Sequence, residues 1–349
     1  MARYSKNFPE NIRTLYTFGV EIEFIVTFKI VDFIEVTKVG SIHHSSRWKL
    51  LRAVYERIVK TMQDNGFAVN SYLSHYIEAS CWTVKQAPSL HLEEFNTKVD
   101  QWGVCPVKLM TPVMTYASPS FDSIDSALSL LKQDFDIITN DSYTYMATEG
   151  KSLQSLGFSL TALENLLCFI WLYQYQLEAI HPPARLCESL CLSPRVLLSH
   201  LNSFTVKQRI SSCTSMKQLC FLWAGSAVYH GHRPDTFAYS IHDMTAHSSA
   251  NGEILDSGNQ TVRFGQHRST MDILEIYHWV MLVGHLVRLA DTCDPWCRPL
   301  GLAVGFDRTQ PVKTSELMTV QLLEEIGAAE HANFYGPRLY KNDRTIAKD

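Results

Sequence analysis

The sequence predicts an α+β protein in which helices pack on one face of a mostly antiparallel sheet. Three observations support this prediction. A segment near the N-terminus alternates between apolar and polar residues as a half-buried strand does, several later segments repeat apolar residues at helical spacing, and no Pro/Gly/Ser-rich linker divides the chain. We therefore expect residues 1–340 to form a single domain, followed by a disordered polar tail at residues 341–349.

The composition is that of an ordinary globular protein. The chain has 349 residues, of which 46% are hydrophobic and 19% charged, enough to bury a large core. The formal net charge of -4, from 31 Lys and Arg against 35 Asp and Glu, lacks the basic excess typical of nucleic-acid binding. The N-terminus has no apolar run typical of a secretory signal. We therefore expect the 9 cysteines, an odd number, to be reduced thiols rather than disulfides. We expect a cytoplasmic protein without nucleic-acid or membrane partners.

The first half of the chain predicts strands and helices in alternation. Residues from Phe18 to Phe28 alternate in part, which indicates a half-buried strand. Apolar residues then recur at three- and four-residue steps, which predicts a helix, and Gly66 is suited to end that helix. Pro106 and Pro112 would confine a later strand to a sheet edge or a strand end, because proline cannot donate a ladder hydrogen bond. The expected elements are the strand 18–28, the helix Ser45–Gln63, the strands Ser80–Val84 and Val104–Met114, and the helix Ser123–Ile138.

The second half contains the clearest helical pattern. Leu160, Leu163 and Leu167 begin one broad apolar face of a helix from Gly157 to Ile180, which Pro182 would end. Polar and charged residues interrupt this apolar stretch, so it predicts a buried helix rather than a membrane span. The other expected elements are the helices Pro194–Phe204 and Ser215–Leu222, the strand Gln260–Phe264 and the helix Met271–Ala290.

Two glutamates near the start of the first strand could carry chemistry. In the segment Gly19-Val20-Glu21-Ile22-Glu23-Phe24, the side chains of Glu21 and Glu23 are two positions apart and point to the same face of a strand. Magnesium takes oxygen ligands, often one or two carboxylates together with phosphate oxygens. The pair therefore fits a metal site, although a charged, solvent-facing side of an amphipathic strand would give the same pattern.

Four later segments follow this motif in an order and spacing that resemble the amidoligase family, the carboxylate–amine ligases of the glutamine synthetase-like fold. The resemblance covers the chain from about Phe18 to Ala290. The four segments are Trp82-Thr83-Val84 with Ser89-Leu90; Leu109-Met110-Thr111-Pro112-Val113; Gly157-Phe158-Ser159-Leu160 with Trp171, His181-Pro182 and Arg185; and Thr261-Val262 with Phe264, Gln266-His267, Thr270 and Trp279.

The resemblance implies a fold, a reaction and a set of site residues. The fold is a curved, mostly antiparallel sheet with helices on its outer face, and the reaction joins a small carboxylate to an amine through an acyl phosphate, with ATP and magnesium as cofactors. The partner would be a carboxylate or amine metabolite, or a peptide or protein carrying such a group. By the same resemblance, Glu21 and Glu23 would hold metal, Gln266 would contact the nucleotide, and His267 and Arg185 would act in catalysis. Lys108 and Arg263, as cations at site positions, are further candidates for contact with the nucleotide.

The sequence departs from the family pattern at several polar positions. Lys108 and Arg263 stand where glutamates are expected, which places positive charge where metal should lie. These cations could instead pair directly with Glu21 and Glu23. The other departures are Ala87 in place of aspartate, Met146-Ala147-Thr148 in place of a His-x-His pair, Gln174 in place of glutamate, and Gly265 in place of arginine.

Two interpretations follow from these departures. In the first, the protein is a pseudoenzyme that keeps the fold and a cleft for a carboxylate or amino-acid-like ligand, and needs no cofactor. In the second, it is a divergent enzyme in which His267 acts as a general base, or an active ATP-dependent ligase. His267 could equally be a structural residue that hydrogen-bonds strand backbone.

Other patterns favour structural roles. Two C-x-x-x-C pairs could in principle bind zinc, but buried free cysteines also behave as small hydrophobes. A histidine-rich stretch lacks further ligands at suitable spacing and favours a polar loop. These residues are Cys187 with Cys191, Cys293 with Cys297, and His230, His232, His242 and His247. No G-x-G-x-x-G, Walker or G-x-S-x-G pattern occurs, which argues against nucleotide sites of those kinds and against a nucleophile elbow.

Overall fold

The computed structural model describes ten segments of the chain. The residues it describes are 16–29, 44–70, 78–87, 102–139, 145–152, 158–182, 203–229, 238–241, 261–293 and 316–339. They combine helices with antiparallel sheet, as the α+β prediction requires. The predicted helix at Pro194–Phe204 lies almost wholly outside these residues, as does the tail at 341–349.

The chain divides into two compact units that interleave along the sequence. The first comprises Met1–Lys6, Gly19–Ala147 and Arg268–Ile276, and the second comprises Asn7–Phe18, Thr148–His267 and Tyr277–Asp349. Each unit therefore contains segments that are distant in sequence, and each is described here by itself.

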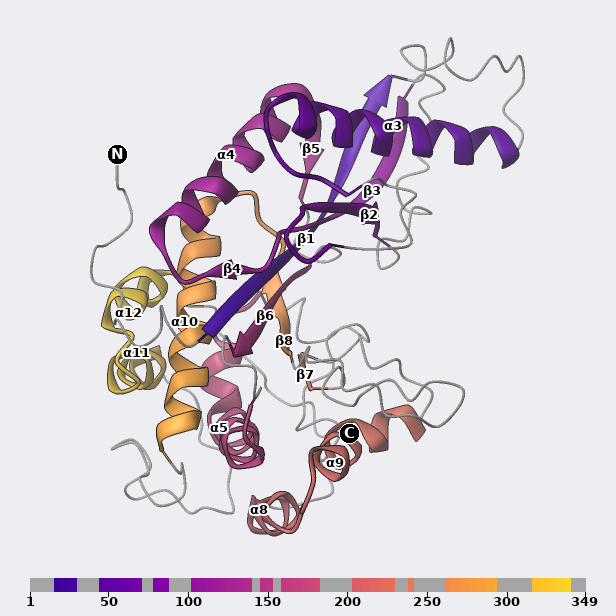
Figure 1. Cartoon of the computed structure of the whole chain (residues 1–349). Helices are drawn as coiled ribbons and strands as arrows, with labels where there is room; N and C mark the ends of the chain where they lie inside the picture. Colours follow the sequence, from indigo (N-terminus) through magenta and orange to yellow (C-terminus); the bar gives the residue numbers. More distant parts are fainter. Residues whose placement is uncertain are drawn as a thin grey trace, which may run out of the picture. The chain divides into compact units, whose positions relative to one another are not determined.

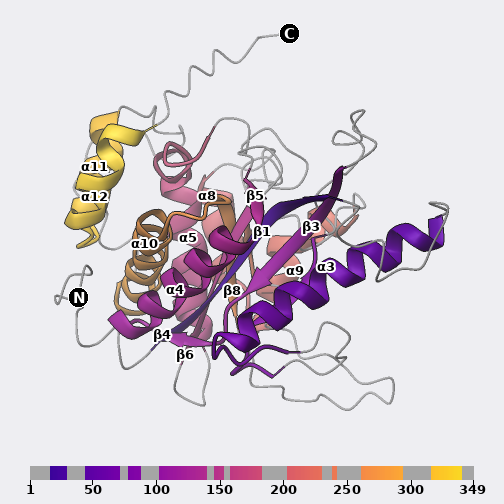
Figure 2. The same cartoon turned by 90° about the horizontal axis from the view of Figure 1, so that it is seen from above.

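The first unit is built on an antiparallel sheet of order β2-β3-β1. Its strands are β1 (Tyr16–Lys29), β2 (Thr83–Gln86), β3 (Trp102–Met110), β4 (Met114–Thr115) and β5 (Asp136–Ile138), the last two also pairing with β1. Helices α3 (His44–Asp64) and α4 (Ser118–Asp134) lie side by side on one face of this sheet (Figures 1 and 2). The predicted strand at 18–28 and helix at Ser45–Gln63 are confirmed, and Gly66 ends the helix with a φ of 85°.

Two predictions for this unit need correction. Helix α4 begins at Ser118 rather than Ser123, because Pro119 occupies its first turn, where proline's missing N–H is no loss. It ends at Asp134 rather than Ile138, since Asp136–Ile138 form strand β5. Strand β3 is an interior strand despite Pro106. The hydrogen-bonded ladder between β3 and β2 ends at the pair Gln86–Val107. Pro106 therefore lies just beyond the end of β2, where its missing N–H costs no hydrogen bond to that strand. Its carbonyl accepts hydrogen bonds from the Tyr55 hydroxyl at 2.7 Å and the Ala87 N–H at 3.3 Å.

The second unit places helices around the strands β6 (Tyr145–Ser152), β8 (Val262–Arg268) and β7 (Tyr239–Ser240), in that order. Helix α5 (Leu160–Glu178) starts at the N-cap Ser159, whose side chain accepts a hydrogen bond from the Ala162 N–H. The side-chain amide of Asn165 donates to the Ala290 carbonyl at 2.9 Å, which ties α5 to α10 (Ile273–Thr292). The remaining elements are α8 (Ser203–Ser211), α9 (Met216–Tyr229), α11 (Glu316–Glu325), α12 (Ala329–Tyr335) and the 3-10 turn η5 (Gly336–Arg338).

Helix α10 is long and apolar, and its residues from Tyr277 onward belong to the second unit. Among the described residues it alone has the length and hydropathy to cross a membrane, and 72% of its apolar window is buried inside the protein. Burial of this extent is expected for a core helix. The predicted helices at Gly157–Ile180, Ser215–Leu222 and Met271–Ala290 thus correspond to α5, α9 and α10, with ends that differ by a few residues.

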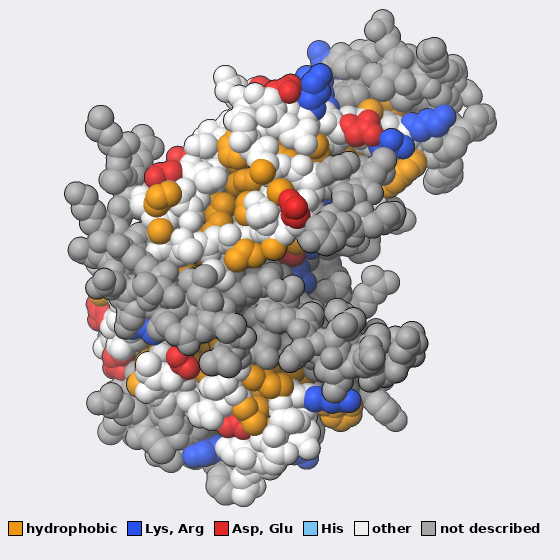
Figure 3. All heavy atoms as spheres, viewed as in Figure 1, with side chains coloured by type: hydrophobic (Ala, Val, Ile, Leu, Met, Phe, Trp, Pro, Cys, Tyr) orange, Lys and Arg blue, Asp and Glu red, His pale blue; other side chains and the backbone are white. Residues whose placement is uncertain are grey.

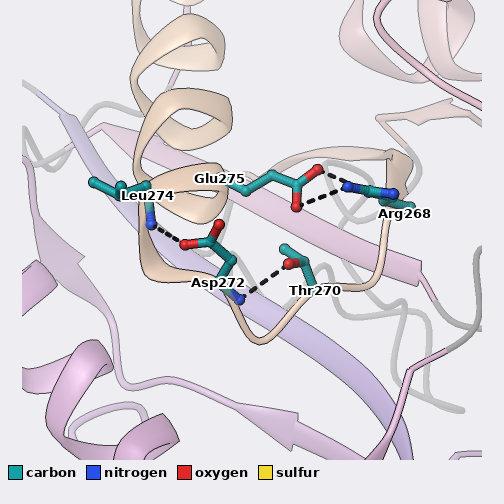
Figure 4. Close-up of polar contacts among 5 residues, drawn as sticks. All are labelled: Arg268, Thr270, Asp272, Leu274 and Glu275. Atoms are coloured by element: carbon teal, nitrogen blue, oxygen red, sulfur yellow. Dashed lines mark hydrogen bonds and ion pairs between the residues drawn. The ribbon is translucent and has the colours of Figure 1, made fainter. Parts of the chain in front are cut away.

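The turn that leads into α10 is fixed by local polar contacts (Figure 4). Asp272 is the N-cap, because its carboxylate accepts a hydrogen bond from the Leu274 N–H at 2.9 Å. The Asp272 N–H in turn donates to the Thr270 hydroxyl at 3.0 Å. The Arg268 guanidinium donates two hydrogen bonds, of 2.8 and 3.3 Å, to the Glu275 carboxylate across the same turn.

Removing the N-cap should weaken this turn measurably. We expect Asp272→Ala to lower the free energy of unfolding by about 1 kcal/mol, because the Leu274 N–H loses its partner. Asp272→Asn keeps an equally good cap and should lose only the smaller interaction of the charge with the helix dipole. Urea unfolding of the three proteins measures the difference, and equal losses in both variants would contradict the assignment of Asp272 as N-cap.

Candidate functional site

The two glutamates of the first strand lie on one face of β1. Val20, Ile22 and Phe24 alternate with them and point to the opposite face, where the core of the first unit lies. Glu21 and Glu23 are themselves buried, and Glu23 is fully inaccessible to solvent. The alternative of a solvent-facing charged strand is therefore wrong. Burial of two carboxylates is unfavourable unless a cation compensates them.

Lys108 supplies that cation. The antiparallel register of β1 and β3 sets Lys108 directly opposite Glu23 and Met110 opposite Glu21. The Lys108 Nζ lies 2.9 Å from Glu21 Oε2 and 3.5 Å from Glu23 Oε1, so one ammonium group contacts both carboxylates. The side chains of Lys108 and Glu21 retain only 14% and 10% of their exposure, so water screens these ion pairs weakly.

Neighbouring hydrogen bonds hold the backbone around this ionic cluster. The Ser269 hydroxyl donates to the Glu23 carbonyl oxygen at 2.6 Å. At the start of the motif, the Val20 N–H donates to the Thr111 hydroxyl and the Val20 carbonyl accepts from the Thr111 N–H, both at 2.9 Å. The strand that carries the glutamates is thus fixed at two points, from the β3–β4 connection and from the segment after β8. Nothing in the composition of the motif predicts the contribution of Ser269.

A second lysine lies next to Lys108 on the same face. Lys85 of β2 is its direct cross-strand partner and is only partly buried. Two ammonium groups in this position would destabilise the sheet if they stood alone. Glu21 and Glu23, which contact Lys108, offset this repulsion.

This cluster does not fit a magnesium ion. Magnesium needs several oxygen ligands at about 2.0–2.1 Å, and the acidic residues expected to complete the set are Lys108 and Ala87 here. The Lys108 ammonium already contacts the oxygens that a metal would use, and two cations there would repel each other. Within the described part of the chain, no group of three or more His, Cys, Asp or Glu residues is arranged to hold a metal ion.

The other predicted site residues on β8 lie in the second unit. Gln266 is fully buried and its side-chain oxygen accepts a hydrogen bond from the Tyr239 hydroxyl. Tyr239 and Phe264 are cross-strand partners in perpendicular ring contact, so Gln266 lies on the Phe264 face of β8. Arg263 and His267 belong to the opposite face. Arg263 is partly buried there, opposite Ser240.

His267 lies in an aromatic cluster rather than at a surface. Its ring centroid is 5.0 Å from that of Trp279 on α10 and 5.8 Å from that of His181, just beyond α5. The rings of His181 and Trp279 meet edge to face at 4.9 Å. Both imidazoles are almost completely buried. This environment favours a packing role for His267, and its role as a general base stays a prediction.

Gln174 departs from the family pattern in a way that the structure explains. The expected carboxylate is absent at this position, but a buried carboxylate, Glu178, lies one helical turn further along α5 and accepts a hydrogen bond from the Gln174 amide. Arg185, the other predicted catalytic residue, lies outside the described residues. So do the histidines of the predicted polar loop and Cys187, Cys191 and Cys297 of the two cysteine pairs.

Comparison with known proteins adds no relative: neither a protein-family model nor a curated protein sequence matches the chain.

The ion cluster makes a quantitative prediction. Lys108→Met should lower the free energy of unfolding by about 3 kcal/mol, because it leaves two buried carboxylates without their cation. Lys85→Met, one strand away, is the matched control and should change stability by about 0.5 kcal/mol or less. Chemical denaturation at neutral pH measures both. Similar small losses in the two variants would show that Lys108 does not compensate the glutamates.

Proposed function

We propose that this protein is a degenerate amidoligase-like protein that does not catalyse ATP-dependent ligation and instead binds a small carboxylate or amino-acid-like ligand. The observation that carries the proposal is the contact of the Lys108 ammonium with both Glu21 and Glu23. In a ligase of this class, the resemblance implies that carboxylates at these positions hold divalent metal. Here a side chain of the protein supplies the positive charge, so the charge balance no longer depends on a metal.

A carboxylate ligand is supported by the second lysine of this face. Lys85 is partly exposed, and among the described residues no carboxylate lies within ion-pair distance of its ammonium group. Glu21 and Glu23 are already engaged by Lys108, which leaves Lys85 as the cation of this face that can pair with an incoming carboxylate. A small ligand with one carboxylate matches this single available charge.

The proposed partners are small metabolites rather than highly charged macromolecular partners such as nucleic acids or membranes. On the face seen in Figure 3, the described acidic and basic side chains are scattered among hydrophobic and uncharged ones and form no basic stripe. This described face offers no basic stripe for nucleic acid, and the proposal keeps the sequence-based expectation of a cytoplasmic protein without nucleic-acid or membrane partners.

An active ligase is the second candidate. Its support is that Glu21 and Glu23 are retained together on one buried face of β1. A lysine side chain is a flexible four-carbon stem, so binding of metal–nucleotide could displace the Lys108 ammonium from the two carboxylates. The two candidates differ in one measurable property, which is the effect of magnesium and ATP on stability.

Thermal unfolding with and without magnesium and ATP separates the candidates. A ligand at a hundred times its dissociation constant stabilises by about 2.7 kcal/mol, which shifts the midpoint by a few degrees. We expect no magnesium-dependent shift for the wild-type protein at millimolar ATP. Lys108→Glu restores a carboxylate where the family pattern has one and should gain such a shift, whereas Lys108→Gln should not. A magnesium-dependent shift in the wild-type protein would overturn the proposal.

The double variant Glu21→Gln/Glu23→Gln gives an independent test. If the glutamates serve Lys108, the variant buries an ammonium without a counter-charge and should unfold more easily by about 2–4 kcal/mol. If they serve catalysis, the variant should keep its fold and lose turnover in a screen of amino acids with ATP. The matched triple variant that adds Lys108→Met removes the orphaned cation and should recover part of the lost stability. An unchanged free energy of unfolding in the double variant would count against the proposal.

A further inference from the structure

Three histidines form a continuous chain of rings where α12 meets α10 in the second unit. His278 and His285 are two helical turns apart and share one face of α10. His331 of α12 lies between them, with its Nδ1 2.8 Å from the Nδ1 of His278 and its ring centroid 5.6 Å from that of His285. All three side chains are buried. The two helices lie side by side in both views (Figures 1 and 2).

The surrounding contacts make these rings the joint between α10 and the C-terminal helices. The ring of Phe334 stacks on His278 at a centroid distance of 3.9 Å, and the Arg338 guanidinium lies 4.1 Å from the Phe334 centroid. Gly327 makes the turn between α11 and α12 with a φ of 82°. A Cβ there would lie 3.4 Å from Arg288 Nη2 and 4.0 Å from His285 Nδ1, so the turn itself rests close to the histidine chain.

The charged groups near the rings are mostly basic. Arg288 on α10 faces His285, and Arg338 of η5 faces His278. The acids of the adjoining elements are turned elsewhere. Asp291 of α10 accepts a hydrogen bond from the Tyr16 hydroxyl, Glu330 of α12 lies beside Tyr277, and Glu324 and Glu325 of α11 are exposed. Among the described residues no carboxylate contacts any of the three imidazoles, and the other titratable groups in ring contact with them are the buried Tyr277 and Tyr335.

We propose that His278, His285 and His331 form a pH-sensitive latch, which holds α12 and η5 against α10 while the rings are neutral and releases them when the rings take up protons. The geometry requires neutral rings. The close Nδ1–Nδ1 contact of His278 and His331 needs one ring to donate and the other to accept, and a doubly protonated ring cannot accept. This latch does not depend on the function proposed above.

The electrostatics of the cluster act in the same direction. Burial, together with Arg338, lowers the pKa of His278 to about 4, and burial with Arg288 lowers the pKa of His285 to about 4. Burial and the other two rings lower the pKa of His331 to about 3. The docked state therefore resists protonation at all three positions.

The sign of the pH effect follows from these pKa values. An undocked histidine has a pKa of about 6.5, so protons bind the undocked state more strongly than the docked one. The stabilisation is complete above pH 6.5 and is lost as the pH falls toward 4. Lowering the pH from 7.5 to 5 should therefore shift the equilibrium toward the undocked state.

Hydrogen exchange on the full-length protein tests the latch. We expect the protection factors of amides in α12 and η5 to fall by about tenfold or more between pH 7.5 and 5.0, after correction for intrinsic exchange rates. The protection of α3 in the first unit should change much less, since it contains no histidine of this chain of rings. Equal protection of α12 at the two pH values in the wild-type protein would overturn the proposal.

Two variants assign the effect to the histidines. His331→Gln should reduce the pH dependence of α12 protection, and His285→Gln at the end of the chain offers the same test if His331→Gln does not fold. Gly327→Ala is the matched control, because it strains the same turn without changing a titratable group. It should lower protection by the same factor at both pH values. A pH dependence that persists unchanged in both histidine variants would contradict the latch.

Discussion

The buried pair Glu21 and Glu23 imposes the constraint on which the first unit depends. A buried carboxylate without a counter-charge is so unfavourable that a protein must pair it, protonate it or expose it. Both glutamates lie on a strand whose two faces are buried, so exposure would require the sheet to open. The structure pairs them with Lys108, and the position of β3 beside β1 is therefore an electrostatic requirement as well as a hydrogen-bonding one.

The geometry of this ionic cluster bears on the proposal that the protein is a degenerate amidoligase-like protein. Lys108, at the cross-strand position of Glu23, reaches both carboxylates with its ammonium group within the regular register of β1 and β3. Its long stem is apolar and can be buried, while its ammonium group takes the place of a dication with one charge instead of two. Lys85, directly opposite Lys108, adds a second positive charge to the same face, which under the proposal serves a carboxylate ligand. The contact of Lys108 with both glutamates supports the proposal of a protein without metal-dependent chemistry.

The sequence predicts the long elements well because their periodicity reflects burial directly. Helices α3, α5 and α10 each bury an apolar stripe, and β1 is rich in apolar residues that alternate in part with polar ones. Short elements cannot be predicted in this way. Strands β4 and β7 contain two residues each, too few to show a periodicity, and form only because neighbouring strands pair with them. The prediction that Pro106 lies in an edge strand was wrong because a proline lacks a hydrogen-bond donor on only one side of its strand. On that side β2 has already ended and no backbone acceptor requires the donor.

The site is predictable to the extent that it depends on local spacing. Glu21 and Glu23 share a face because they are two positions apart, and their pairing with a lysine follows from the cation found where an acid is expected. The burial of His267 against Trp279 depends on which face of β8 meets α10, which local spacing does not determine.

The histidine chain needed a further contact that sequence does not contain. The spacing of His278 and His285 places both on one face of α10, but His331 comes from a helix far along the chain and was not recognisable as their neighbour. The two polar clusters therefore illustrate two solutions to the same cost of burial. In the first unit, opposite charges compensate one another. In the second, the groups are neutral, and a change of protonation alone is enough to make their burial unfavourable.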